Sequence, residues 1–153
     1  DSSGHIGCLE SKGITIAILP TPINKDKIYP KTNTKLANDI LENNGCLISE
    51  YHEFSPVNRY NFVNRDRLQC GLADGTIVVE TGEKGGTMHA VNGTIKLGKP
   101  LGCFSYTEEH YQQYEHSRGN KLLLSKGARK LNSVEEINKF IDDCRVTDQM
   151  TLM

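Results

Sequence analysis

Residues 80–90, ETGEKGGTMHA, combine residue types that suit contact with a phosphate group. They follow the apolar run TIVV and open a segment with helical spacing, so the glycines lie where a strand passes into a helix. Gly85 and Gly86 let backbone N–H groups approach a ligand, and the first turn of a helix presents unpaired N–H groups. Thr87 adds a hydroxyl and Lys84 a full charge. The pattern fits phosphate binding, but a glycine turn with a threonine cap and an exposed lysine explains it equally well.

A second basic cluster, NRYNFVNRDR, lies at the end of a predicted polar loop. It interleaves three arginines with two aromatic residues, Arg59, Tyr60, Phe62, Arg65 and Arg67. Arginines and aromatic rings together are typical of sites for single-stranded nucleic acid, because the cations meet phosphates and the rings stack on bases. The alternative is structural: Phe62 anchors the core, and Arg67 pairs with Asp66 or Glu50. For the cluster as a whole, phosphate contact is favoured.

A third basic segment, PTPINKDKIYPK at residues 20–31, contains three prolines and is predicted to be an irregular loop. It carries Lys25, Lys27 and Lys31 together with Tyr29. A charge run of this kind is usually a solvated face. This loop follows a predicted strand, as the other two basic segments do, and the carboxyl ends of parallel strands share one edge of a sheet. Three basic loops at one edge predict a positively charged groove.

The elements that position these loops alternate between strand and helix. Short β-branched or apolar runs predict strands, which are 14–19, 46–49, 75–80, 100–104 and 128–131. Amphipathic spacing, caps and glycine stops predict helices, which are 2–13, 32–45, 64–73, 86–98, 119–127 and 133–144. The last helix opens with a capping box, Ser133 and Glu136. Residues 105–117 read as a polar connector, and a buried strand is expected at 14–19.

The alternation predicts an α/β fold, a doubly wound and mostly parallel sheet with helices on both faces. One domain is expected over residues 1–144, followed by a frayed tail at 145–153. The chain opens on a helix, whereas such a sheet usually opens on a strand. The fold is therefore expected to lack its first strand.

Composition narrows the class of protein. The 153 residues are 37% hydrophobic and 24% charged, with a formal net charge of −1, which argues against a generally basic coat for nucleic acid. We expect no membrane span, because no apolar run approaches about 20 residues, and no signal peptide. Five cysteines at wide spacing, without a C-x-x-C pair, predict free thiols in a reducing cytoplasm rather than disulfides or a zinc site. We expect no metal and no cofactor.

Catalytic patterns are weak. His110 and His116 lie six residues apart in a polar segment, a poor match to helical metal-ligand spacing, and are interpreted as surface residues. Glu50 and Glu80 each end a predicted strand. Paired carboxylates there suit acid–base chemistry, but holding the arginines or capping backbone groups is the favoured role. We assign no catalytic residue.

Residues 1–143 resemble the Rossmann-like domain of the DNA-processing protein A family, known as DprA or Smf. The resemblance is collinear and is carried by the segments LESKGITIAIL, IYPKTN, LISEY, FVNRDRLQCGLADGTIVVETGEKGGTMHA and SRGNKLLLSKGARKLNSVEEI. The last resembles the closing Gly-x-Asn segment of that family.

The resemblance implies a cytoplasmic homodimer that binds and protects single-stranded DNA. It also implies hand-over of that DNA to the RecA recombinase during recombination and natural transformation, without an enzymatic reaction. The family's DNA-groove positions fall on Arg65, Arg67, Lys84, Gly85, Gly86 and Thr87. Phe62 would position the arginine loop, and we add Lys27 from the first basic loop.

The sequence departs from the family at three places. Pro20 and Pro22 stand where the family has a Gly-x-Gly after the first strand, and Asp66 replaces an asparagine between the two arginines. The upstream Gly-Ser-Arg loop of the family, a main phosphate contact, does not occur in this sequence. The small N-terminal domain and the winged-helix domain of the family do not occur in it either. A core fragment or a divergent member is expected.

A second hypothesis is a binder or hydrolase of a small nucleotide-derived ligand. Related Rossmann-like phosphoribohydrolases use Pro-Gly-Gly-x-Gly-Thr-x-x-Glu at the position of this glycine turn. The sequence KGGTMHAVN keeps the Gly-Gly and a threonine but lacks the leading proline, the third glycine and the glutamate. A scaffold kept for dimerisation or partner contact is a third possibility.

Overall fold

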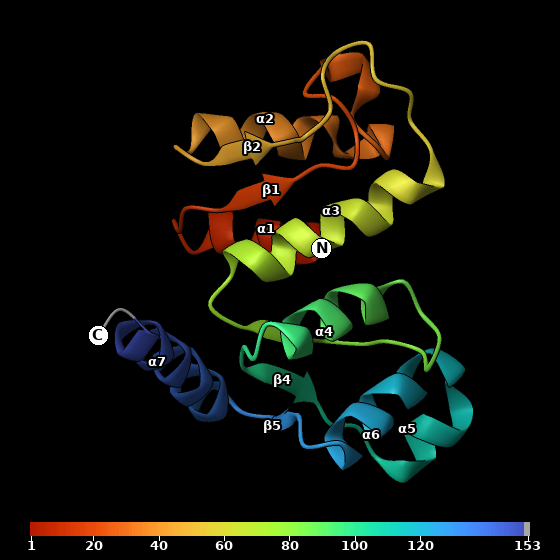
Figure 1. Ribbon diagram of the computed structural model, residues 1–153, viewed down its shortest axis with the longest axis vertical. Helices are drawn as coiled ribbons and strands as arrows, with labels where there is room; N and C mark the ends of the chain where they lie inside the picture. The colour runs from red at the N-terminus through yellow and green to blue at the C-terminus, as the bar shows by residue number, and fades with distance from the viewer. Residues whose placement is uncertain (152–153) are drawn as a thin grey trace. The chain divides into compact units, whose positions relative to one another are not determined.

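A computed structural model describes residues 1–151, and side chains up to residue 145. The chain forms two compact units, the first spanning Asp1–Arg65 and the second beginning at Asp66 (Figure 1). Where the sequence predicted one sheet, the described residues contain two parallel sheets, one in each unit. The prediction of one domain over residues 1–144 stays a prediction.

The first unit is a β–α–β arrangement with a helix before it. Its sheet pairs β1 (Ile16–Ile18) with β2 (Cys46–Ile48) in parallel, with Ile16 opposite Cys46. Helix α1 (Ser2–Glu10) precedes β1, and α2 (Thr34–Glu42) connects the two strands and packs on both. Buried Ala37 and Ile40 form the inward side of α2. Two 3₁₀ turns, Lys25–Lys27 and Lys31–Asn33, lie within the proline-rich connection.

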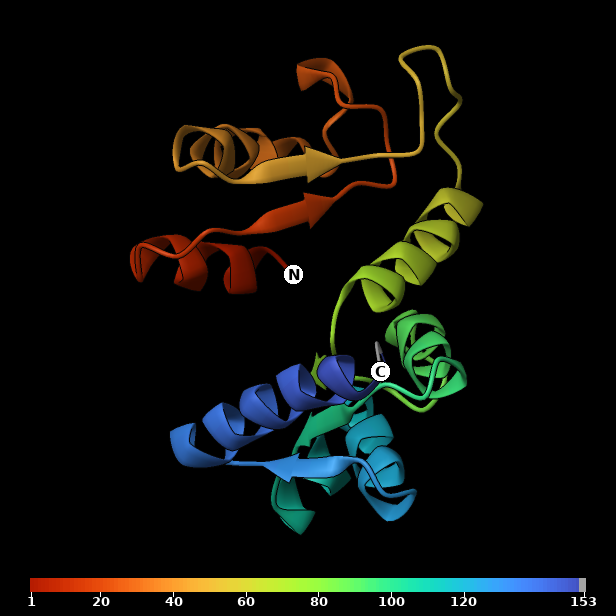
Figure 2. The ribbon, with the colours of Figure 1, turned by 60° about the vertical axis from the view of Figure 1, so that its left-hand side comes forward.

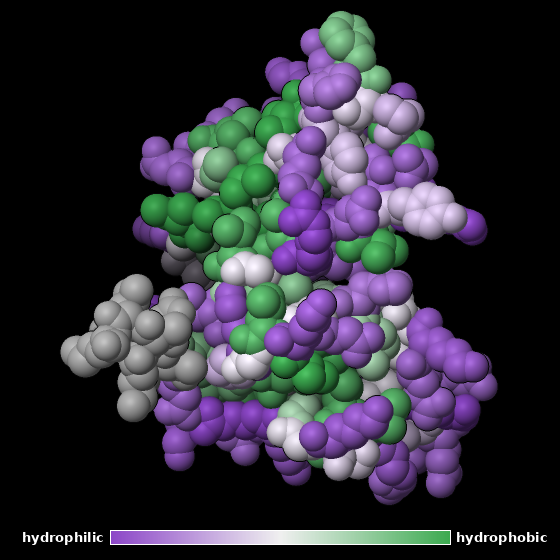
Figure 3. Space-filling view, viewed as in Figure 1, coloured by the Kyte–Doolittle hydropathy of each residue, from purple (hydrophilic) through white to green (hydrophobic). Residues whose placement is uncertain are grey.

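The strand expected to be buried in this unit is only partly covered. Ala17 is buried, whereas Ile14 and Ile16 are 70% and 54% exposed. Exposed apolar side chains gather over the first unit in the space-filling view (Figure 3). Because α2 covers the strands from one side, alternate side chains of β1 point away from that cover.

The second unit contains a three-stranded parallel sheet in the order β3–β4–β5. The strands are β3 (Thr76–Val78), β4 (Leu101–Phe104) and β5 (Arg129–Leu131). Val78 lies opposite Cys103, and Cys103 lies opposite Lys130. Helix α4 (Thr87–Lys96) connects the first pair of strands, while α5 (Glu108–Gln113), a 3₁₀ turn and α6 (Arg118–Ser125) connect the second.

Helices cover both faces of this second sheet. On one face, Val78 and Cys103 pack with Val91 of α4 and Leu123 of α6. On the other, Leu131 packs with Phe140 and Cys144 of α7 (Val134–Thr151), which lies along β5 (Figure 2). The prediction of an α/β fold with parallel strands is confirmed, and in this unit helices lie on both faces of the sheet.

Two segments that were predicted to be loops contain helical residues, so both predictions are wrong in part. Helix α3 (Arg59–Leu72) begins at Arg59, five residues before the predicted helix at 64, because Asn58 caps it by accepting a hydrogen bond from the Tyr60 N–H at 2.9 Å. The predicted connector at 105–117 contains α5, which Thr107 caps by accepting from the His110 N–H at 3.2 Å.

The capping box that opens the last helix is confirmed. The Glu136 N–H donates to Ser133 Oγ at 3.2 Å, and the Ser133 N–H donates to Glu136 Oε2 at 3.1 Å. Helix α7 then continues past residue 144, where the sequence predicted it to end, up to Thr151. The prediction that residues 145–153 fray stays a prediction, and residues 152–153 lie outside the described residues. Among the helices described, none is long and apolar enough to cross a membrane.

Candidate nucleic-acid interface

The glycine turn of the second unit joins the end of β3 to the start of α4, as the sequence predicted. Its backbone closes on itself, because the Gly85 N–H donates to the Gly82 carbonyl at 3.3 Å. A Cβ at Gly85 would lie 3.0 Å from Thr81 Oγ1, so the turn leaves little room for a side chain at that position. Gly86 is the N-cap of α4, and a Cβ added there would meet no atom within 4 Å. The turn is thus tight at Gly85 and open at Gly86.

The open side of this turn carries the groups that suit a phosphate. Lys84, Gly86 and Thr87 are exposed, and Gly85 is half-buried. Helix α4 begins directly behind them, so the positive end of its dipole faces the turn. The N–H groups of Met88 and His89 donate to the carbonyls of Gly85 and Gly86 at 3.1 and 3.0 Å, so the N–H groups of Gly86 and Thr87 are the ones placed to meet a ligand. Four of the predicted site residues therefore lie together, on one turn of one unit.

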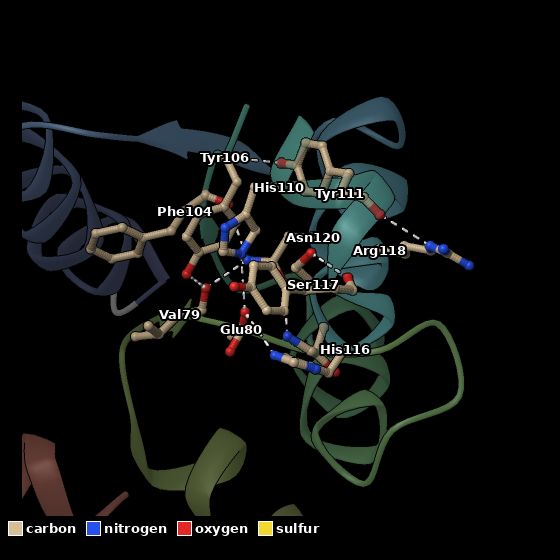
Figure 4. A network of polar contacts seen from close by, with 12 residues as sticks. Val79, Glu80, Phe104, Tyr106, His110, Tyr111, His116, Ser117, Arg118 and Asn120 are labelled. Carbon is tan, nitrogen blue, oxygen red and sulfur yellow. Dashed lines mark hydrogen bonds and ion pairs between the residues drawn. The ribbon is translucent and has the colours of Figure 1, made fainter. Parts of the chain in front are cut away.

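A buried clamp, which sequence reasoning did not assign, holds the start of this turn. Asn120 of α6 is 0% exposed. Its Nδ2 group donates to the carbonyls of Val79 at 2.6 Å and Phe104 at 3.0 Å, and its Oδ1 accepts from the Thr81 N–H at 2.7 Å (Figure 4). The clamp joins the ends of β3 and β4, from which the loops of this edge depart. The signal was present in the sequence, as the segment SRGN, which resembles the closing Gly-x-Asn segment of the family.

Gly119 completes the clamp through close backbone approach. Its N–H donates to the Thr81 carbonyl at 2.9 Å. A Cβ at Gly119 would lie 2.5 Å from the carbonyl oxygens of Thr81 and Gly82, which real structures do not tolerate. Glycine is therefore required here because helix α6 touches the backbone of the glycine turn.

Glu80 also lies at this edge, with partners that the sequence did not predict. Its Oε1 atom is 3.4 Å from Nε2 of His110 and 3.5 Å from Nε2 of His116 (Figure 4). The two histidines, interpreted from the sequence as separate surface residues, thus converge on one carboxylate. Their spacing of six hid this because α5 ends and a 3₁₀ turn intervenes between them. Among the described residues, no group of histidine, cysteine and carboxylate side chains is arranged to hold a metal ion.

Arg65 lies on α3, as the predicted helix over 64–73 implied, and Phe62, expected in the loop before that helix, lies on α3 as well. Both belong to the first unit. Arg65 Nη1 donates to the carbonyl of Ile18, the last residue of β1, at 3.0 Å, and its side chain is 17% exposed. Phe62 is half-buried and packs edge-on against Tyr29 with ring centroids 5.5 Å apart. These contacts fix α3 against the end of β1 and against the proline-rich loop.

Lys27 belongs to that proline-rich loop and is half-buried. Its Nζ donates to the backbone carbonyl of Glu53. The part of the loop that carries Pro20 and Pro22 is buried, with Thr21 between them. Where the family has glycines, this loop therefore turns inward instead of offering backbone N–H groups to solvent.

The predicted site residues thus fall into two groups. Lys27, Phe62 and Arg65 belong to the first unit, and the others, Arg67, Lys84, Gly85, Gly86 and Thr87, belong to the second. Arg67 is exposed on α3. A single groove formed by all eight residues stays a prediction.

Parallel strands joined by helices, with a glycine turn opening a helix beyond a strand end, define a Rossmann-like α/β protein. The chain belongs to the family described as DNA recombination-mediator protein A, whose model matches residues 1–142. The resemblance drawn from the sequence motifs is confirmed.

Individual relatives agree with this assignment. The chain is 38% identical over 149 residues to protein Smf of Synechocystis, covering 97% of this chain and 36% of that protein. It is 32% identical over 137 residues to protein Smf of Escherichia coli, covering 90% and 35%. The chain thus spans well under half the length of these relatives.

Two solved structures share the fold. DNA processing protein A of Streptococcus pneumoniae matches with a TM-score of 0.79 at 25% identity, covering 91% of this chain and 47% of that one. The protein of the same name from Helicobacter pylori, whose structure concerns its single-stranded DNA binding mode, matches with a TM-score of 0.70 at 28% identity. That match covers 84% of this chain and 56% of the other.

Proposed function

We propose that this chain binds single-stranded DNA in the manner of DNA processing protein A and acts by binding, without catalysing a reaction. The observation that carries the proposal is the family match over residues 1–142, together with a structural relative described by its single-stranded DNA binding mode. We further propose that it works in the cytoplasm as a homodimer and passes the DNA to a RecA-type recombinase.

The glycine turn is the proposed phosphate contact. The backbone N–H groups of Gly86 and Thr87 and the charge of Lys84 meet one phosphate, and Thr87 adds a hydroxyl. Arg67, exposed on α3 of the same unit, meets a second phosphate. Contacts to phosphates carry little sequence information, so binding is expected to be nearly independent of base sequence and sensitive to salt.

Arg65 has a different role in this proposal. Its guanidinium already binds the Ile18 carbonyl at the end of β1 and is mostly buried. Replacing it with alanine removes a structural contact as well as a charge. The DNA test uses Arg67 and Lys84, which are both exposed and belong to the second unit with the glycine turn.

The test is a titration of fluorescent oligo-dT at 50 mM and at 150 mM salt. The double variant R67A/K84A is compared with K96A/K126A, which removes the same charge from the carboxyl-terminal ends of α4 and α6. Two lost phosphate contacts should weaken binding at 50 mM salt and lower the slope of log K against log salt by about 1.4 for a single strand. The control pair should retain the affinity and slope of the wild type.

Equal binding by both double variants means that the glycine turn is not the DNA contact. No binding by the wild type even at 50 mM salt overturns the proposed activity for this chain. Sedimentation equilibrium tests the homodimer, and co-sedimentation with a RecA-type recombinase on oligo-dT tests the hand-over.

A further inference from the structure

A cavity of about 440 Å³ lies in the second unit beyond the carboxyl ends of β4 and β5. It is lined by Ser105, Tyr106, Thr107, His110, Lys130 and Asn132. None of these residues belongs to the glycine turn or to α3, so the cavity is separate from the proposed DNA contacts. Its volume falls in the ~300–1,000 Å³ range of small-molecule sites, and its position is where open parallel sheets bind ligands.

One wall of the cavity is aromatic and rigidly held. The rings of Tyr106 and His110 stack with centroids 4.4 Å apart and planes 15° apart. The Tyr106 hydroxyl donates to the Val79 carbonyl at 2.9 Å, and its N–H donates to the Tyr111 hydroxyl at 3.0 Å (Figure 4). A planar, preorganised wall of this kind suits stacking against an aromatic ligand.

The polar and charged lining residues come from the ends of the strands β4 and β5. Lys130 of β5 is exposed, and among the ion pairs of the described residues it takes part in none. Asn132 Oδ1 accepts from the Ser105 N–H at 3.1 Å, which fixes the amide and leaves its Nδ2 donors for other partners. Ser105 and Thr107 add hydroxyl groups. This side of the cavity is therefore suited to an anion and to hydrogen-bonding edges.

The nearby carboxylates are already engaged. Glu80 faces His110 and His116 and is not part of the lining. Glu136 accepts from the N–H groups of Asn132 at 2.6 Å and Ser133 at 3.1 Å. Lys130 is thus the cationic side chain among the lining residues, and it favours a negative ligand.

We propose that this cavity is a binding site for a nucleoside monophosphate unit, with its base against the Tyr106–His110 wall and its phosphate at Lys130 and Asn132. An inorganic anion would leave the aromatic wall unused, and an uncharged aromatic molecule would leave Lys130 unused. The unit comes either from a free nucleotide or from one nucleotide of a DNA strand, since both present the same base and phosphate.

The test is a ¹H–¹⁵N NMR titration of the full chain with thymidine monophosphate, thymidine and inorganic phosphate. Thymidine monophosphate should shift the amide signals of the lining residues more strongly than either fragment does. K130Q should weaken its binding about fivefold, the effect of losing one exposed charge contact, whereas K126Q should not. Lys126 is a matched control because it is exposed and lies outside the lining.

Shifts confined to other residues, no shifts at all, or equal affinity of K130Q and K126Q overturn the proposal. A parallel titration with oligo-dT identifies the source of the unit. If both ligands shift the lining signals, the site accepts a nucleotide of a strand. If only the monophosphate does, it accepts a free nucleotide. R67A/K84A should leave the binding of thymidine monophosphate unchanged, which separates this site from the proposed DNA interface.

Discussion

The side-chain amide of Asn120 ties the backbone of Thr81 to helix α6, accepting the Thr81 N–H at 2.7 Å from a fully buried position. The same amide donates to the ends of two strands, at Val79 and Phe104. One residue therefore satisfies three backbone groups where the glycine turn and the next loop leave the sheet. Such a polar link in a dry interior is worth most when every member is paired.

Replacing Asn120 should destabilise the protein strongly. N120A removes the amide partner of the Thr81 N–H and of the Phe104 carbonyl, while the Val79 carbonyl keeps its bond from the Tyr106 hydroxyl, and we expect the free energy of unfolding to fall by about 3 kcal/mol. N120D keeps the acceptor for Thr81 but places a carboxylate beside two carbonyl oxygens, and should be at least as damaging. Urea unfolding followed by circular dichroism measures both.

The neighbouring K121A variant is the control, because Lys121 is exposed and its pair with Glu108 lies at the surface. It should change the free energy of unfolding by less than about 1 kcal/mol. A loss in N120A no larger than in K121A would show that the clamp contributes nothing to stability.

Gly119 should resist substitution even though it lies in a helix. Alanine normally favours a helix by about 1 kcal/mol over glycine, but a Cβ here would lie 2.5 Å from two carbonyl oxygens. G119A should therefore lower the melting temperature. G71A, in the last turn of α3 with open space around it, should leave the melting temperature unchanged or raise it. Equal responses of the two variants would contradict the close approach of α6 to the turn.

Signals between residues close in sequence predicted most helices and strands. Contacts between residues far apart in sequence could not be predicted in this way. Ser133 and Glu136 sit three residues apart, so the capping box that opens α7 could be read directly. The caps at Asn58 and Thr107 are equally local, but the polar residues after them obscured the helices that they begin. Apolar periodicity is weak where a helix has little buried surface, as α5 does.

The candidate site divides in the same way. The glycine turn was predicted because its chemistry lies within four successive residues, 84–87. The meeting of Glu80 with His110, thirty positions away, depends on how β3 and β4 pair, and spacing along the chain does not encode it. The burial of Thr21 between two prolines and the bond from Arg65 to Ile18 likewise arise only from packing.

His5 should make the protein less stable in mild acid. Burial lowers the pKa of this imidazole, whose Nδ1 lies 2.7 Å from Thr15 Oγ1. Between the folded pKa and the ordinary value near 6.5, the unfolded chain binds more protons than the folded chain. The free energy of unfolding should therefore fall as the pH drops below 6.5 towards the folded pKa.

Urea unfolding at several pH values between 7.5 and 5 measures this effect. H5Q should flatten the slope relative to the wild type, because it removes the titrating group. H52Q, which removes an exposed imidazole, is the matched control. Parallel pH profiles for the wild type and H5Q would show that His5 does not supply the dependence.

The cysteines should react in an order set by burial. Cys103 is 0% exposed, and burial raises the pKa of its thiol to about 11, so little thiolate forms at neutral pH. Cys46 is exposed. A short pulse of iodoacetamide at pH 7.5 followed by peptide mass mapping should find Cys46 modified and Cys103 intact, with both modified in urea. Modification of Cys103 as fast as Cys46 in the folded protein would contradict the packing of β4 against α4 and α6.

Gly86 offers the sharpest separation of DNA binding from stability. Its φ of −57° and ψ of −37° are accessible to any residue, and a Cβ there meets no atom within 4 Å. G86A should therefore fold with a free energy of unfolding within about 1 kcal/mol of the wild type. On oligo-dT it should bind several-fold more weakly, because the new methyl group occupies the path by which a phosphate reaches the N–H groups of Gly86 and Thr87. G71A, the same change on the open side of α3, should bind like the wild type. If G86A binds as tightly as G71A while R67A/K84A still loses affinity, the phosphate contacts the charged side chains and not the backbone of the turn.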